Sequence, residues 1–236
     1  MKLQHFLSKQ GVFSRRQSEK MINDGYILIN GVVEDNHLFD VSNDDNVTFH
    51  PKISSYAKQL GLLLINKPRG VWTNCKQGNK EKEVIDLLPK RFKGYSSIGR
   101  LDKDSEGLIL FTNHGPFANQ FLNAGEEHMR IYSIRTKMPL NDQHLLSLKK
   151  GVFLDDGLTK PCDIYQIKNN AYEIILKEGK NRQIRRMIEW CGTHVTFLKR
   201  LTFAEYKLGS LKPGEFKFMS LESSFFKKAK LLGLIK

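Results

Sequence analysis

The sequence has 236 residues, which is enough for one large and one small domain at about 150 residues per domain. Its 27% charged and 40% hydrophobic residues are typical of globular proteins. The 38 Lys and Arg against 25 Asp and Glu give a net charge of +13, which indicates a polyanionic partner, nucleic acid before a membrane surface. The apolar runs are too short to span a bilayer, the N-terminus lacks the apolar core of a signal peptide, and the three cysteines form no CxxC pair. We therefore expect a cytoplasmic protein with no membrane partner, no disulfide framework and no metal site.

Residues 1–50 are expected to form a small unit of two helices and a β-hairpin. Apolar residues at helical spacing predict the first helix, and a capping box of Ser14 and Gln17 predicts the start of the second. Asn30 and Gly31 predict the hairpin turn. Bases dominate the first half of this unit and acids the second, so we expect one basic and one acidic side.

Residues 51–59 are polar and begin with proline, which is typical of a linker. Residues 60–236 are expected to form a larger α+β domain with a mostly antiparallel sheet. Strands are predicted at residues 62–65, 108–112, 131–136, 172–177, 195–198 and 216–219, and helices at 116–123 and 181–191. The lysine-rich tail, residues 225–236, is either a docking helix or a loose basic arm.

The first segment that could carry chemistry is the charged loop over residues 99–107. The sequence contains no Walker P-loop, HExxH or GxSxG motif, so the common nucleotide, zinc-protease and hydrolase sites are excluded. The loop lies between apolar residues, and loops held by rigid strands are favoured places for catalytic groups. Its carboxylates, on Asp102, Asp104 and Glu106, cannot be ranked by composition. Composition favours a surface turn with local ion pairs as the alternative.

The second segment is the basic stretch over residues 178–187. On a helix, Arg182, Arg185 and Arg186 lie at i, i+3 and i+4, so they are predicted to share one face. A solvated basic face is the alternative, but a phosphate or an internal carboxylate explains three neighbouring guanidinium groups better. Tyr132, on its predicted strand, is by itself best explained as a core tyrosine.

These segments resemble motifs of the RsuA-like pseudouridine synthases, and the resemblance runs over nearly the whole chain. Residues 2–50 resemble an S4 RNA-binding domain. The motifs that carry the resemblance are Ser14-Arg15-Arg16, Ile29-Asn30-Gly31, Lys67-Pro68-Arg69-Gly70, Gly99-Arg100-Leu101-Asp102, Ser105-Glu106-Gly107-Leu108, Met129-Arg130-Ile131-Tyr132 and residues 178–187. Within the family, the details look closest to the branch that acts on large-subunit rRNA, with tRNA as a second target of some members.

The resemblance implies conversion of uridine to pseudouridine in RNA, a rearrangement that needs no cofactor or metal. Asp102 is the expected catalytic group, by covalent attack on the sugar or base or by promoting deprotonation at C2′. Arg185 is expected to keep Asp102 ionised, because a nearby positive charge favours the charged carboxylate. Tyr132 is expected to stack on the uracil and to help remove the C5 proton.

The target uridine must be unpaired or flipped out of its helix, so the chain is expected to hold both the base and the RNA backbone. The residues expected to do so are Arg100, Ile184, Lys67, Arg182, Arg186, Arg15 and Arg16. The sequence departs from the family pattern at three positions, where Arg130 replaces Lys, Thr202 replaces Arg and Ala204 replaces Gly.

Two other functions fit parts of the sequence. A non-catalytic S4-type RNA-binding or ribosome-associated factor would have the same charge and the same residues 1–50, but it has no need of Asp102, Tyr132 and Arg185 together. A DNA-binding regulator explains only the first 25 residues, so no DNA partner is expected. We expect the protein to be a monomer.

Overall fold

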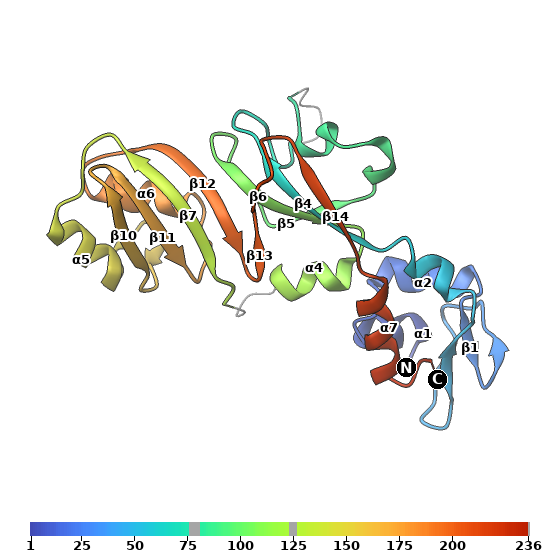
Figure 1. The fold of residues 1–236 in the computed structure, drawn as a ribbon. Coiled ribbons are helices and arrows are strands. Elements are labelled where there is room, and N and C mark those ends of the chain that lie inside the picture. Colours follow the sequence, from blue (N-terminus) through green and yellow to red (C-terminus); the bar gives the residue numbers. More distant parts are fainter. Residues whose placement is uncertain (76–80, 123–126, 236) are drawn as a thin grey trace. The chain divides into compact units, whose positions relative to one another are not determined.

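The computed structural model describes residues 1–75, 81–122 and 127–235 (Figure 1). Its helices are α1 (Leu3–Lys9), α2 (Arg15–Asn23), α3 (Ile53–Ala57), α4 (Gly115–Leu122), α5 (Asp142–Lys150), α6 (Gln183–Trp190) and α7 (Glu222–Leu231), with 3₁₀ turns η1 (Val84–Leu87) and η2 (Lys90–Phe92). Its strands are β1 (Ile27–Ile29), β2 (Val32–Val33), β3 (Val47–Phe49), β4 (Gly61–Lys67), β5 (Ser96–Ile98), β6 (Glu106–Thr112), β7 (Arg130–Thr136), β8 (Phe153–Leu154), β9 (Gly157–Leu158), β10 (Asp163–Lys168), β11 (Ala171–Leu176), β12 (Val195–Phe203), β13 (Tyr206–Lys207) and β14 (Phe216–Ser220).

Contacts between residues divide the chain into two compact units. Unit 1 contains Met1–Leu63, Thr112–Leu122 and Phe218–Lys236, and unit 2 contains Leu64–Phe111 and Asn123–Lys217. The units therefore differ from the division into residues 1–50, 51–59 and 60–236 that the sequence suggests, because unit 1 also takes in a helix from the middle of the chain and the C-terminal segment.

The N-terminal part of unit 1 follows the sequence pattern closely. The Ser14 side chain accepts a hydrogen bond from the backbone of Gln17, and the Gln17 side chain accepts one from the backbone of Ser14, so the predicted capping box is confirmed. Asn30 and Gly31 have φ angles of 52° and 85° and form the predicted hairpin turn. A third strand, β3, pairs with β1 and gives the sheet order β2-β1-β3. The sequence pattern does not indicate β3, because its three residues, Val47, Thr48 and Phe49, form only a short segment within a polar stretch.

The core of unit 1 is an aromatic cluster from four separate parts of the chain. The ring of Phe225 in α7 lies 5.9 Å from that of Phe13, 6.0 Å from that of Phe49 and 5.8 Å from that of Tyr56. The C-terminal tail is therefore ordered, and the backbone of Leu234 accepts a hydrogen bond from Phe49 at 2.7 Å. Of the two forms expected for the tail, the structure has the docking helix.

The segment expected to be a linker forms helix α3. Ile53 and Ala57 are buried, and Tyr56 from the same helix joins the aromatic cluster. Helix α4 also belongs to unit 1, because Gln17 donates a hydrogen bond to the carbonyl of Asn113 and the His114 ring contacts the carbonyl of Val12 at 2.9 Å. The expected helix at residues 116–123 is thus present up to residue 122, and residue 123 lies outside the described part of the chain.

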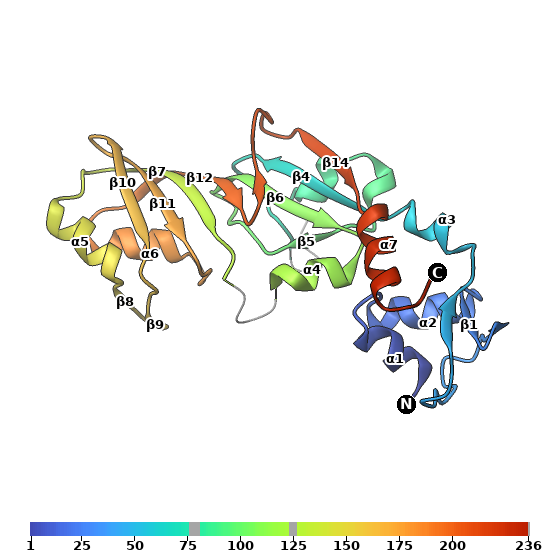
Figure 2. The ribbon, with the colours of Figure 1, turned by 60° about the horizontal axis from the view of Figure 1, so that its bottom comes forward.

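The sheet that positions the candidate site has the order β10-β11-β7-β12-β6-β4-β14, with β5 beside β6 and β13 beside β12. Every predicted strand of the larger domain is present in it. β7 pairs antiparallel with β11 and β12, whereas β12 pairs parallel with β6. Helix α6 lies across one face formed by β10, β11, β7 and β12 and contacts β12 (Figures 1 and 2).

Gly107 allows the parallel contact between β6 and β12. Its φ is 105°, and a Cβ atom there would lie 2.3 Å from the backbone oxygen of Arg200. The Arg200 guanidinium closes the same contact by donating to the carbonyl of Leu108 at 2.7 Å. A side chain at position 107 would therefore force these two strands apart.

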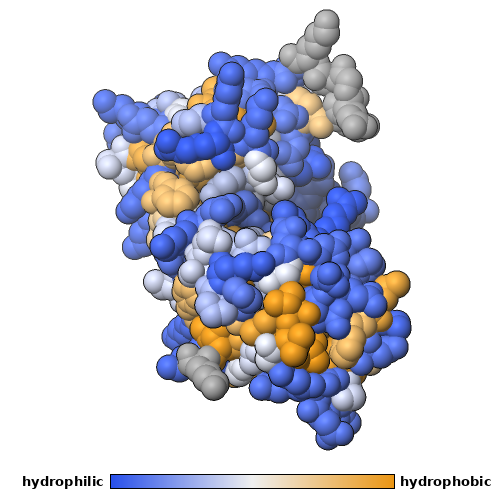
Figure 3. All heavy atoms as spheres, turned by 90° about the vertical axis from the view of Figure 1, so that its right-hand side faces the viewer, coloured by the Kyte–Doolittle hydropathy of each residue, from blue (hydrophilic) through white to orange (hydrophobic). Residues whose placement is uncertain are grey.

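The architecture confirms the expected α+β class with a mostly antiparallel sheet. None of the helices in the described ranges is long and apolar enough to cross a membrane. On the face drawn in Figure 3, hydrophilic residues predominate and hydrophobic residues gather in a smaller area, in keeping with the strongly charged composition.

Replacing Phe225 with alanine is expected to destabilise unit 1 by about 3 kcal/mol or more, because the ring lies at the centre of the aromatic cluster and its loss leaves a cavity. Urea unfolding followed by circular dichroism would measure the change. Phe226→Ala, which removes a half-buried ring from the same helix, serves as the control and should cost clearly less. Equal losses in the two variants would contradict the central place of Phe225.

Candidate active site

The charged loop between β5 and β6 carries Asp102 at the edge of a cavity. The cavity has a volume of about 350 Å³, which is within the usual range for ligand sites of roughly 300–1,000 Å³. The Asp102 side chain is 28% exposed, so its carboxylate is accessible from the cavity but partly shielded from water. The surface-turn alternative is therefore not what the structure contains at this position.

Lys67 anchors the backbone of this loop through its buried ammonium group. Its side chain is completely buried, and its ammonium group donates hydrogen bonds to the carbonyls of Pro68, Lys103 and Ser105 at 3.0, 3.2 and 2.7 Å. Burial lowers the pKa of Lys67 to about 8, although the nearby carboxylates, Asp102 first among them, oppose the shift. All three donors are used within the protein, so the expectation that Lys67 contacts RNA is wrong; the residue holds the loop.

The segment before α6 does not continue the helix, and this changes the predicted arginine face. Arg182 has φ 46° and ψ 32°, in the left-handed region, which costs a non-glycine residue about 1–2 kcal/mol. The prediction that Arg182, Arg185 and Arg186 share one helix face is therefore wrong. The left-handed residue nevertheless brings the Arg182 side chain to Asp102, with 3.6 Å between Nη1 and Oδ2.

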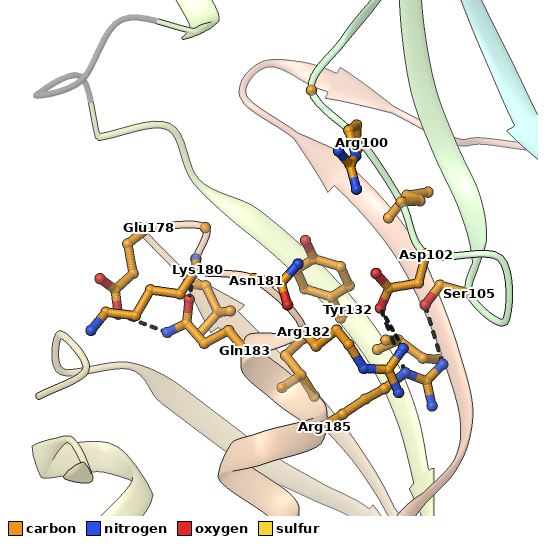
Figure 4. Close-up of a pocket in the computed structure, with 16 residues that line it drawn as sticks. Arg100, Asp102, Ser105, Tyr132, Glu178, Lys180, Asn181, Arg182, Gln183 and Arg185 are labelled. Carbon is orange, nitrogen blue, oxygen red and sulfur yellow. Dashed lines mark hydrogen bonds and ion pairs between the residues drawn. The ribbon is translucent and has the colours of Figure 1, made fainter. Parts of the chain in front are cut away.

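Arg185 is the second cation facing Asp102. Its Nε lies 3.7 Å from Oδ2 of Asp102, and its Nη2 donates to the Ser105 hydroxyl at 3.2 Å (Figure 4). Nε is buried and has no hydrogen-bond partner among the described residues. Burial lowers the pKa of Arg185, and the neighbouring charge of Arg182 adds to this shift, whereas Asp102 opposes it. The carboxylate thus faces two guanidinium groups at ion-pair distance.

Arg186 points away from this cluster. Its Nη1 and Nη2 donate to the two carboxylate oxygens of Asp156, both at 2.9 Å. Lys180 donates to the carbonyls of Asp156 and Gly157, both at 3.0 Å. The guanidinium of Arg186 therefore fixes the β8–β9 hairpin to α6, and the RNA contact expected for Arg186 stays a prediction.

Tyr132 and Ile184 complete the apolar wall of the cavity. Tyr132 lies on β7, opposite Arg200 of β12, and is 9% exposed. Ile184 is 5% exposed in the first turn of α6. Both line the same cavity as Asp102, and Figure 4 shows their elements around it. An aromatic ring beside a carboxylate suits a flat, polar ligand that must be stacked and held against a charged group.

Arg100 is exposed and lines both this cavity and an adjoining one of about 400 Å³. The structure thus brings together the expected site residues Arg100, Asp102, Tyr132, Arg182, Ile184 and Arg185. Ser105, Asn181 and Gln183 also line the cavity. The sequence alone does not predict roles for them, although they lie within the motifs at residues 105–108 and 178–187.

Arg15 and Arg16 belong to unit 1 and do not line this cavity. Both are exposed in the first turn of α2 and line a separate surface hollow with Gln4 and His5. Among the described residues, no group of three or more His, Cys, Asp or Glu is arranged to hold a metal ion.

The structure shows the surroundings or the backbone conformation at two of the departures from the family pattern, Arg130 and Ala204. Arg130 stacks on the ring of Phe203, 5.1 Å away, and donates to the carbonyl of His128, so its charge is used within the fold. Ala204 has φ 52°, the region in which glycine is favoured. The backbone therefore keeps the conformation that suits the family's glycine.

The buried ammonium group of Lys67 predicts a pH-dependent stability. Its pKa in the folded chain, about 8, lies below the ordinary value of 10.5, so the unfolded chain binds the proton more tightly. The stability of the wild type relative to Lys67→Met should therefore rise as the pH increases from 8 to about 10.5, by at most roughly 1.4 kcal/mol per pH unit.

Urea unfolding of both proteins across this pH range would measure the effect, with removal of the exposed Lys93 as the control. A stability difference that stays flat or falls with rising pH would contradict the buried charge.

Comparisons with known proteins show which family the chain resembles. A family model described as RNA pseudouridylate synthase matches residues 61–190, and a model of the S4 domain matches residues 1–45. The chain is 33% identical over 220 residues to the dual-specificity RNA pseudouridine synthase RluF of Salmonella typhi, which covers 92% of this chain and 74% of the relative. It is 34% identical over 220 residues to an RNA pseudouridine synthase of Rickettsia bellii, which covers 92% and 95%.

A solved structure described as a pseudouridylate synthase matches the fold with a TM-score of 0.66 at 21% identity. The match covers 97% of this chain and 99% of that one. Family model, relatives and fold therefore agree: the chain belongs to the RNA pseudouridine synthase family, and its N-terminal residues form an S4 domain.

Proposed function

We propose that this chain isomerises uridine to pseudouridine at specific sites in RNA, with Asp102 as the catalytic group. The observation that carries the proposal is the half-buried Asp102 carboxylate, which faces a cavity of about 350 Å³ together with Tyr132, Arg182 and Arg185. Membership of the RNA pseudouridine synthase family and the geometry of the cavity both support this chemistry.

The reaction breaks the bond between N1 of uracil and C1′ of ribose and forms a bond between C5 and C1′. The C5 proton is lost and N1 gains a proton, so the product has the same atoms as the substrate. Asp102 starts the reaction, either as a nucleophile or by promoting deprotonation at C2′. Because no group is gained or lost, the chain needs no cofactor for this chemistry.

The other cavity residues have supporting roles in this proposal. Arg185 and Arg182 hold the Asp102 carboxylate by their positive charge, and Ser105 orients Arg185 through its hydroxyl. Tyr132 stacks on the uracil and assists removal of the C5 proton, and Ile184 packs against the base. Arg100, exposed at the edge of the cavity, holds a backbone phosphate or the space left by the flipped base.

We infer that large-subunit rRNA is the main substrate and that tRNA is a second one. The motif details resemble the branch with these targets, and the Salmonella typhi relative is named a dual-specificity enzyme. A cytoplasmic location and a monomeric state stay predictions.

Pseudouridine mapping tests the proposal directly. Large-subunit rRNA fragments, small-subunit rRNA and total tRNA would be incubated with the protein, and modified positions would be read from reverse-transcription stops after carbodiimide derivatisation of pseudouridine. Product in large-subunit rRNA is expected. Tight RNA binding without product on any RNA or pre-ribosomal particle would instead favour a non-catalytic RNA-binding factor.

Asp102→Asn is expected to lower product formation by more than about three orders of magnitude, a loss of at least 4 kcal/mol of transition-state stabilisation. The amide keeps the size of the side chain but cannot act as an anionic nucleophile or base. RNA affinity should stay within about threefold, because backbone contacts provide most of it. Single-turnover assays and filter binding would measure both quantities.

Asp104→Asn is the matched control, because it removes an exposed carboxylate from the same loop. Its rate should stay near that of the wild type. Comparable turnover by Asp102→Asn and the wild type would remove Asp102 from the mechanism.

Replacing Arg15 and Arg16 together with alanine is expected to lower the affinity for RNA and to make that affinity less dependent on the salt concentration. Both side chains are exposed, and each phosphate contact contributes about 0.7–0.9 to the slope of log affinity against log salt concentration. The double variant should reduce this slope by about 1.5, measured by filter binding between 50 and 200 mM salt.

Lys20→Ala serves as the control on the same helix, because Lys20 is already paired with Asp24. An unchanged slope in the double variant would mean that the S4 domain does not hold the RNA backbone through these two arginines.

A further inference from the structure

Thr73 binds both sides of the backbone next to Asp102. Its hydroxyl donates to the carbonyl of Leu101 at 2.8 Å and accepts from the backbone N–H of Leu101 at 3.0 Å. The Thr73 side chain is 2% exposed, and Leu101 is 9% exposed. One hydroxyl 28 residues away therefore fixes the two peptide groups that flank Leu101.

These hydrogen bonds replace a strand partner for the loop. Leu101 lies outside the strands, so its buried N–H and carbonyl have no sheet neighbour to pair with. The carbonyl of Leu101 belongs to the peptide group that leads into Asp102. Its orientation therefore determines the direction in which the Asp102 side chain leaves the backbone.

The other end of the loop is held separately. The carbonyl of Lys103 accepts hydrogen bonds from Lys67 at 3.2 Å and from the backbone of Gly70 at 2.8 Å. Asp102 thus lies between two anchored residues, Leu101 and Lys103. Its own carboxylate meets Arg182 and Arg185 at 3.6 and 3.7 Å, which are ion-pair distances longer than a normal hydrogen bond. The position of the carboxylate therefore depends mainly on the backbone.

We propose that Thr73 is a positioning residue that sets the place of the Asp102 carboxylate through the Leu101 backbone. This inference rests on the proposed catalytic role of Asp102. Catalytic groups must be held within about 0.5 Å of their productive geometry, and a displacement of about 1 Å can cost a factor of 100 in rate. Loss of the Thr73 hydroxyl leaves two buried backbone groups unpaired and frees the loop on one side.

A pair of variants separates the hydroxyl from the rest of the side chain. Thr73→Val keeps the shape but removes the hydroxyl, and Thr73→Ser keeps the hydroxyl but removes the methyl group. We expect Thr73→Val to lower kcat by 10- to 100-fold, with KM and RNA affinity within about threefold of the wild type. Thr73→Ser should restore kcat to within about threefold.

Thr112→Val is the matched control for loss of a buried threonine hydroxyl. The Thr112 hydroxyl also makes two backbone hydrogen bonds, donating to Gly61 at 2.7 Å and accepting from His114 at 3.1 Å, but it belongs to unit 1. Its loss should lower the melting temperature as Thr73→Val does and leave kcat near that of the wild type. A kcat loss in Thr112→Val equal to that in Thr73→Val would reduce the effect to general destabilisation and overturn the proposal.

Hydrogen exchange at the Leu101 amide provides a readout that does not depend on activity. We expect exchange to accelerate at least tenfold in Thr73→Val and to stay near the wild-type rate in Thr73→Ser. Unchanged exchange in Thr73→Val, unchanged kcat in Thr73→Val, or a Thr73→Ser enzyme as slow as Thr73→Val would overturn the positioning role. A wild type that modifies no RNA would overturn the proposed function itself, independently of the exchange result.

Discussion

The candidate site depends on the close parallel contact between β6 and β12 at Gly107 and Arg200. Gly107 follows the Asp102 loop, and Arg200 lies opposite Tyr132 on the neighbouring strand β7. The contact therefore sets the distance between the carboxylate and the aromatic wall of the cavity. A backbone oxygen 2.3 Å from the position of a Cβ atom leaves no room for any residue other than glycine. The glycine of the loop motif is thus explained by strand packing, without any direct part in the chemistry.

The charged side chains near this contact have separate partners. Asp102 faces two guanidinium groups, the loop beneath it is held by a fully buried lysine, and Arg186 is directed away to the β8–β9 hairpin. Arg182 and Arg185 face Asp102 whereas Arg186 binds Asp156, although the sequence presents all three arginines in a single basic run. Partly buried charges of opposite sign stabilise each other more strongly than exposed ones, so the two guanidinium groups stabilise the carboxylate where it faces the cavity.

Unit 1 depends on a different constraint, the aromatic cluster around Phe225. The S4 domain reaches its full core only when α3, α4 and α7 are included, because an isolated segment of 50 residues buries too little apolar surface. Lys227, Lys228 and Lys230, which suggested a loose arm, therefore lie on the helix that also carries the buried Phe225 and Ala229.

The resemblance to a known family indicated the motif residues Asp102, Tyr132 and Arg185. Local patterns in the sequence determined the helices and hairpin of the S4 domain and most strands of the larger sheet. These features depend on capping, turn chemistry and apolar periodicity, all of which act over a few residues. The tertiary structure alone decided that Arg182 leaves the helix, that Arg186 faces Asp156, and that Lys67 is buried beneath the loop. It also decided that Thr73 binds the backbone of Leu101 and that the segment expected to be a linker contains helix α3 (Ile53–Ala57). Each of these outcomes depends on a partner many residues away, and pairing over such distances follows from the packing of the whole chain rather than from any local pattern.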